Sequence, residues 1–152
     1  MDSTVIDSVE ASLRALALEG ILPPEQEWLG CTPAQIAEIE ERMARTLSPA
    51  HRQFLERVGR TPSRLFGGSD VLWRRVTELR DWTDALLTAS GPDPLTPDAV
   101  PVLVHQGYIA FWTLGHANDP PVWAFSEGTT PEPEPAYATF SEWLLSLGRD
   151  WS

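Results

Sequence analysis

Three histidines and one cysteine are the residues of this chain best suited to chemistry. His105, His116 and Asp119 could together form a metal site of two histidines and one carboxylate. Their spacing matches no ligand pattern, such as two histidines one helical turn apart. The two histidines fall at expected turns, and His51 falls in the first turn of an expected helix. The sequence therefore predicts turn and cap histidines, and no metal ligand.

The motifs of nucleophilic and phosphate chemistry are missing from the sequence. The chain has no Gly-x-Ser-x-Gly turn, and without lysine it cannot contain the phosphate loop that ends in Gly-Lys. Gly67-Gly68 is more typical of a turn. Cys31 precedes a helix start, which could lower its pKa, but no histidine is near it in sequence. A Ser-His-Asp triad could still assemble from distant positions. We nevertheless predict no catalytic residue, no cofactor and no enzymatic activity.

Glu38 and Glu41 share one face of an expected helix, and paired carboxylates can transfer protons. A solvated face next to Arg42 and Arg45 explains them more simply. We favour this second interpretation.

The seven tryptophans are the most unusual feature of the composition. One small core seldom accommodates seven indoles with every N–H satisfied, so some are expected at the surface. Exposed Trp and Tyr are typical of protein-interface hot spots. We predict a concave partner-binding surface on the sheet and its loops, near Trp73, Tyr108, Trp112 and Asp119. The alternative is that the first or last helix covers these aromatic residues.

The net charge of −11 is distributed in blocks. Residues 1–41 carry nine acids and one arginine, residues 42–80 carry nine arginines and three acids, and residues 81–152 carry ten acids and one arginine. Such an acidic protein repels nucleic acids and anionic lipid, so neither is an expected partner. The central arginines are expected to pair with the acidic flanks. A patch for an anionic partner is the alternative.

The length of 152 residues suits one domain, which we place at 1–152. The N-terminus lacks the features of a signal peptide, and no apolar run is long enough to span a bilayer. A single cysteine fits a reducing compartment. The expected location is therefore the cytoplasm.

The chain must position these residues with helices first and strands later. Helices are expected over about 4–19, after caps at Thr32 and Ser48, over 77–89, and after a cap at Thr139. Strands are expected at 71–73, 102–104, 108–113 and 122–125, with loops at 91–101 and 130–135. Adjacent strands with short turns must be antiparallel. The order indicates an α+β fold: N-terminal helices packed on a mainly antiparallel sheet, with a closing C-terminal helix.

Residues 32–147 resemble the SUKH superfamily, which includes the yeast cell-wall-synthesis regulators. The resemblance begins with a helix, a Leu-x-Pro turn and a helix that ends in a hydrophobic residue and glycine, and it continues through a glycine turn, a strand pair, a D-P-P-V-aromatic strand and a closing helix. These features fall at Glu40, Leu47, Pro49, Phe54, Leu55, Val58, Gly59, Leu65–Gly68, His105–Tyr108, Asp119–Trp123 and Phe140–Leu144. The family commonly has Leu-Pro at the first turn, and here Ser48 intervenes.

The resemblance implies an α+β domain without catalytic residues. Many bacterial members look like immunity proteins that bind and neutralise toxin domains, often nucleases or deaminases. We therefore expect a protein-binding domain whose partner is a cognate toxin. The alternative that the family also allows is a regulatory or scaffold module that binds a cellular protein.

Overall fold

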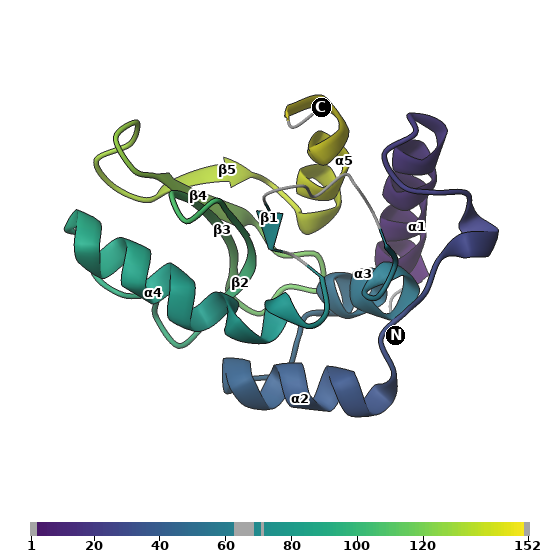
Figure 1. The fold of residues 1–152 in the computed structure, drawn as a ribbon, viewed down its shortest axis with the longest axis horizontal. Helices are drawn as coiled ribbons and strands as arrows, with labels where there is room; N and C mark the ends of the chain where they lie inside the picture. The colour runs from purple at the N-terminus through teal and green to yellow at the C-terminus, as the bar shows by residue number, and fades with distance from the viewer. Residues whose placement is uncertain (1–2, 63–68, 71, 151–152) are drawn as a thin grey trace.

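The computed structural model describes residues 3–62, 69–70 and 72–150, and it confirms the α+β fold (Figure 1). The elements, in chain order, are α1 (Ser3–Leu18), η1 (Glu25–Glu27), α2 (Pro33–Met43), α3 (Pro49–Val58), β1 (Ser69–Asp70), η2 (Arg75–Glu78), α4 (Leu79–Ser90), β2 (Ala99–His105), β3 (Ile109–Leu114), β4 (Val122–Ser126), β5 (Glu134–Tyr137) and α5 (Phe140–Asp150). The predicted glycine turn at Leu65–Gly68 lies outside the described residues.

Side-chain caps begin the helices where the sequence predicts them. The Thr32 hydroxyl accepts from the Gln35 N–H at 3.2 Å, and the Gln35 side chain accepts from the Thr32 N–H at 2.9 Å. Ser48 caps α3 by accepting from the His51 N–H at 3.2 Å. These bonds satisfy donors that have no partner within the helix, which fixes where α2 and α3 start.

The five strands form one antiparallel sheet in the order β1-β2-β3-β4-β5. A three-residue loop, Gln106–Tyr108, joins β2 to β3, and its first two residues have positive φ, 49° at Gln106 and 78° at Gly107. Such turns match the twist of the strands they connect, so the predicted hairpin is confirmed.

Three predicted boundaries were wrong. The strand predicted at 71–73 is observed at Ser69–Asp70 instead. Leu72 and Trp73 lie in the bend and turn that follow, where the Trp73 N–H donates to the Gly59 carbonyl at 2.8 Å. Val71 lies outside the described residues. Strand β2 starts at Ala99, inside the expected loop, and an irregularity between Pro101 and Leu103 accommodates the proline. Strand β5 includes Glu134 and Pro135 of the expected 130–135 loop.

Strand β5 is an edge strand, where proline is tolerated because only one side of the strand must pair. Pro135 lies opposite Trp123, and Glu134 lies opposite Ala124. Glu134, Pro135 and Ala136 are exposed.

Helices cover both faces of the sheet (Figure 1). On one face, the Phe111 ring lies 5.9 Å from the Trp143 ring of α5. Val104 pairs with Ala110 on the opposite face, and Val104 lines a groove together with α4 side chains. Helix α1 in turn packs on α3 and α5. The central core between these helices includes the buried rings of Phe54, Phe140 and Trp143.

Candidate functional site

The four predicted partner-binding residues lie on different parts of the fold. Tyr108 follows the β2–β3 turn, whereas Asp119 lies in the β3–β4 loop, so the length of β3 separates them by roughly 20 Å. Trp73 lies in the turn before η2. Tyr108 is the most accessible of the four, with 39% of its surface exposed.

Trp112 is the least accessible of the four, with only 4% of its surface exposed. It lies on the same face of β3 as Ala110, the face that α4 covers. The prediction assumed that helices pack on one face of the sheet only. With α4 on the second face, Trp112 belongs to the core.

Asp119 stabilises the fold at the start of α5. Its carboxylate accepts from the Ser141 N–H at 3.0 Å and from the Ser141 hydroxyl at 2.7 Å. The neighbouring Asn118 carbonyl accepts from the Ala50 N–H at 3.1 Å. These bonds tie the β3–β4 loop to α3 and α5, so the Asp119 carboxylate is already engaged within the fold.

The tryptophans are less accessible than the composition suggested. Among the six that the structure describes, Trp28, Trp112 and Trp143 are buried, and Trp73, Trp82 and Trp123 are half-buried. The Trp28 indole N–H donates to the Pro23 carbonyl at 2.8 Å. Any aromatic contact with a partner through the described tryptophans therefore uses an edge of one of the half-buried rings.

Burial holds two of the groups suited to chemistry, Cys31 and His51, in their neutral forms. Burial raises the pKa of the Cys31 thiol to about 11, so the thiol stays protonated at neutral pH. Burial lowers the pKa of His51 to about 3, and neither ring nitrogen has a hydrogen-bond partner among the described residues. His116 contacts Arg45 at 2.8 Å between the ring Nδ1 and a guanidinium nitrogen. Within the described residues, no cluster of three or more His, Cys, Asp or Glu side chains has an arrangement suited to a metal ion.

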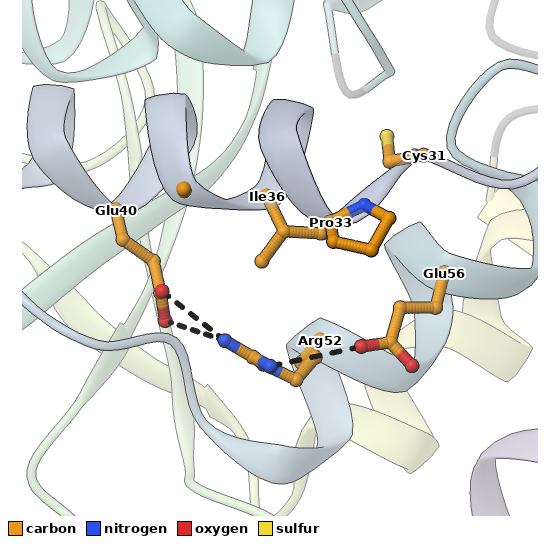
Figure 2. Close-up of a pocket in the computed structure, with 7 residues that line it drawn as sticks. Cys31, Pro33, Ile36, Glu40, Arg52 and Glu56 are labelled. Carbon is orange, nitrogen blue, oxygen red and sulfur yellow. Dashed lines mark hydrogen bonds and ion pairs between the residues drawn. The ribbon is translucent and has the colours of Figure 1, made fainter.

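A groove of about 380 Å³ lies between α2 and α3, and we call it the α2–α3 groove (Figure 2). It is lined by Cys31, Pro33, Ile36, Ala37, Glu40, Arg52 and Glu56. Arg52 extends across it to both Glu40 carboxylate oxygens, at 3.1 and 3.2 Å, and lies 3.8 Å from Glu56. Glu40 also accepts from the Leu47 N–H at 2.8 Å. The charges of this groove are therefore paired with one another.

A second groove of about 430 Å³ lies between α4 and the β2–β3 hairpin, and we call it the α4 groove. It is lined by Trp82, Ala85, Leu86, Ala89, Val104, Gly107 and Glu127. Ala85 and Ala89 are exposed, and their small side chains leave the wall of the groove open. A hollow of about 440 Å³ adjoins it and shares Glu127; its other lining residues are Ser90, Phe125, Gly128, Thr129, Thr130 and Pro131.

The rim of the α4 groove is acidic at its Glu127 end. Glu127 is exposed and makes no ion pair with any described residue. Glu132 directly follows Pro131 of the adjoining hollow, Asp93 lies three residues after Ser90, and both are exposed. At the other end, the Arg75 guanidinium lies 5.9 Å from the centre of the Trp82 ring. The groove therefore has an aromatic end beside a cation and an open end with carboxylates that make no ion pair with the described residues.

Sequence reasoning missed this groove, although it placed Tyr108 correctly in the hairpin that forms one wall. The sequence predicts the α4 helix, and its polar and small residues indicate that one side of this helix is exposed. What the sequence could not show was the packing of α4 against the hairpin, which brings Ala85 and Glu127 to the same groove.

A sequence model of the SMI1 / KNR4 family (SUKH-1) matches residues 30–146. No curated protein matches the chain. No helix among the described residues is long and apolar enough to cross a membrane.

Proposed function

Because the chain belongs to the SMI1 / KNR4 family (SUKH-1), we propose that it is an immunity protein, which binds and neutralises a cognate toxin domain without catalysing a reaction. The family is generally associated with immunity proteins. A toxin of the nuclease or deaminase type is the proposed partner. Such a toxin acts on nucleic acid inside the cell, so the proposed site of action is the cytoplasm of a bacterium.

The observation that carries this proposal is that six arginines of the central segment are engaged within the protein, with carboxylates or with backbone carbonyls. Arg57 binds Glu10 and Glu25, and Arg52 binds Glu40. Other arginines donate to backbone carbonyls of the fold: Arg42 to Thr77, Arg45 to Gly115, Arg60 to Gly30, and Arg80 to Leu95, Thr96 and Ala99.

Many acidic side chains, in contrast, are exposed and make no ion pair with another described residue. They include Asp7, Glu19, Glu27, Glu38, Glu41, Asp81, Asp93, Glu127, Glu132 and Glu134. A nuclease presents cationic side chains to the phosphates of its substrate. An acidic partner attracts that same face, which speeds association and covers the substrate site. The charge pattern supports a basic protein partner and opposes a nucleic acid partner.

The states of the candidate catalytic groups support a binding role. A nucleophilic cysteine needs a thiolate, and burial keeps the Cys31 thiol protonated. A general base needs a pKa near the working pH, and that of His51 is about 3. Both groups are suited to packing in the core.

Co-expression tests the proposal. The toxin domain is taken from a secreted multidomain protein whose gene lies beside the gene for this chain. It is expressed in cells with and without the proposed immunity protein. We expect the protein to restore growth and to co-purify with the toxin domain. Failure of both protection and co-purification would refute the immunity function, and a stable partner recovered from unstressed cells instead would favour the regulatory or scaffold role.

A further inference from the structure

We propose that the α4 groove binds a partner segment in which an apolar side chain is followed by arginine or lysine. The inference rests on the proposed immunity function in one respect, since it assigns this segment to the toxin. It goes further by naming the surface and the chemistry that the surface recognises.

The apolar part of the segment fits the Trp82 end of the groove. Trp82 is half-buried, Leu86 forms part of the lining, and the exposed Ala85 and Ala89 occupy little of the space beside them. An aliphatic or aromatic side chain placed there would cover the exposed edge of the indole. Burial of apolar surface against a tryptophan is typical of the residues that dominate binding energy in interfaces.

The cationic part of the segment fits the Glu127 end. The Glu127 carboxylate is unpaired among the described residues, and Glu132 and Asp93 add negative charge nearby in the chain. At the opposite end, the Arg75 guanidinium beside Trp82 repels a second cation. The two ends therefore specify the direction of the bound segment, with its apolar side chain at Trp82 and its cation at Glu127.

The acidic end is held in place before any partner binds. The Glu127 N–H donates to the Tyr108 carbonyl at 2.9 Å, which joins the β4–β5 turn to the hairpin. Within that turn, the N–H groups of Thr129 and Thr130 donate to the Ser126 carbonyl at 3.1 and 3.0 Å. The Thr130 hydroxyl also accepts from the Ser126 N–H at 3.0 Å. A preorganised turn reduces the entropy lost on binding.

The α2–α3 groove offers an internal comparison. It has a similar volume of about 380 Å³, but Arg52 already provides the cation for Glu40 and Glu56. An incoming arginine there would have to displace Arg52. Both grooves have an exposed alanine in a helical wall, Ala85 in α4 and Ala37 in α2, so the same substitution can block either one.

The first experiment uses a peptide and does not depend on the toxin. A hexapeptide of alternating leucine and arginine is titrated into the purified protein while backbone amide shifts are followed by NMR, with a leucine–glutamate hexapeptide as the control. We expect shifts at Ala85, Ala89 and Glu127 with the arginine peptide only. Ala85→Arg should abolish them, whereas Ala37→Arg, which adds the same charge, should retain them. Shifts spread over the whole acidic surface, or centred on α2, would overturn the proposal.

The second experiment uses the toxin domain. We expect Ala85→Arg and Glu127→Lys each to weaken toxin binding by about tenfold or more, and Ala37→Arg to change it by less than about twofold. Equal affinity in all three variants would overturn the assignment of the groove and leave the immunity function intact. If the wild-type protein neither binds nor protects against the toxin, the immunity function fails, and the peptide titration alone decides whether the groove recognises apolar–cationic segments.

Discussion

The N-terminal helices α1–α3 and the α4 groove differ in whether their carboxylates are paired with arginines. Around α1–α3, carboxylates meet arginines at short distances, as Glu10 meets Arg57 at 3.0 Å and Glu40 meets Arg52 at 3.1 Å. At the α4 groove, Glu127 has no cation within the described residues. Paired charges beside buried side chains hold a fold together, whereas an unpaired charge beside an open apolar groove is available to a partner. Substitutions in the first region should therefore affect stability, and those in the second should affect binding.

The largest loss of stability is expected from Phe54→Ala. The Phe54 ring is fully buried in α3 and lies 5.9 Å from the Phe140 ring of α5. Its removal should lower the free energy of unfolding by about 3–5 kcal/mol, because it leaves a cavity between two helices. Urea unfolding measures this loss. A loss below about 1 kcal/mol would mean that α3 and α5 are not joined through this ring.

The next largest effect is expected from pH acting through His51. In the unfolded chain, His51 becomes protonated when the pH falls below its ordinary pKa of 6.5. In the folded protein, it stays neutral until the pH falls to about 3. The unfolded state therefore binds more protons between these values, and stability should fall as the pH drops, by about 1.4 kcal/mol per unit.

A matched variant isolates this contribution. His51→Leu should lose that part of the slope between pH 6 and 4, as measured by urea unfolding at each pH, with His116→Gln as the control at an exposed histidine. Equal slopes in His51→Leu and the wild-type protein would contradict burial of a neutral imidazole.

Arg57→Ala should lower stability by about 2 kcal/mol. Arg57 bonds to Glu10 and Glu25 and lies 5.1 Å from the centre of the Trp28 ring, so its loss removes the nearer of the two arginines that contact the half-buried Glu10. Thermal or urea unfolding measures the change. Arg14→Ala, at a more exposed arginine that also contacts Glu10 and Glu25, should cost less than about 1 kcal/mol. Equal losses of stability in the two variants would contradict a larger contribution from Arg57 than from Arg14.

Thr32→Ala removes the cap of α2 and should cost about 1 kcal/mol. Thr46→Ala, at an exposed threonine outside the helices, is the control and should have little effect. Chemical unfolding with matched m-values resolves a difference of this size. Indistinguishable stabilities would show that the capping box contributes nothing measurable.

Glu127→Gln is expected to have the smallest effect on stability, within about 0.5 kcal/mol of the wild-type protein, because the carboxylate is exposed and makes no ion pair with the described residues. The same variant should weaken binding of the leucine–arginine peptide, and the difference should shrink as salt is added. If Glu127→Gln lowered stability without weakening peptide binding, Glu127 would belong with the structural charges of α1–α3, contrary to the comparison above.

The parts of the fold that depend on neighbouring residues could be predicted from the sequence. The caps at Thr32 and Ser48 and the turn at Gln106-Gly107 act over two to four residues, and the structure has all three. The predicted pairing of central arginines with the acidic flanks is confirmed for Arg52 and Arg57. Charge blocks of opposite sign allow such pairing without specifying which residues meet.

The site depended on long-range packing, which the sequence does not encode locally. Trp112 has the same strand pattern whether its face is open or covered, and the position of α4 decides between the two. Asp119 occupies an ordinary turn in the sequence, and its bonds to Ser141 form only when α5 reaches the β3–β4 loop. Strand β5 was missed because Glu134 and Pro135 disfavour strands in isolation, and only pairing with β4 makes them extended.

The exposed edge formed by β5 also determines how copies of this protein behave when crowded together. An unpaired edge invites strands of other molecules to add, which leads to aggregation. Here Pro135 removes one backbone donor and Glu134 brings a charge to the same short strand. Two molecules that approach through β5 meet like charges and an incomplete set of hydrogen bonds. This edge is therefore a poor template for the addition of a strand from another copy of the protein.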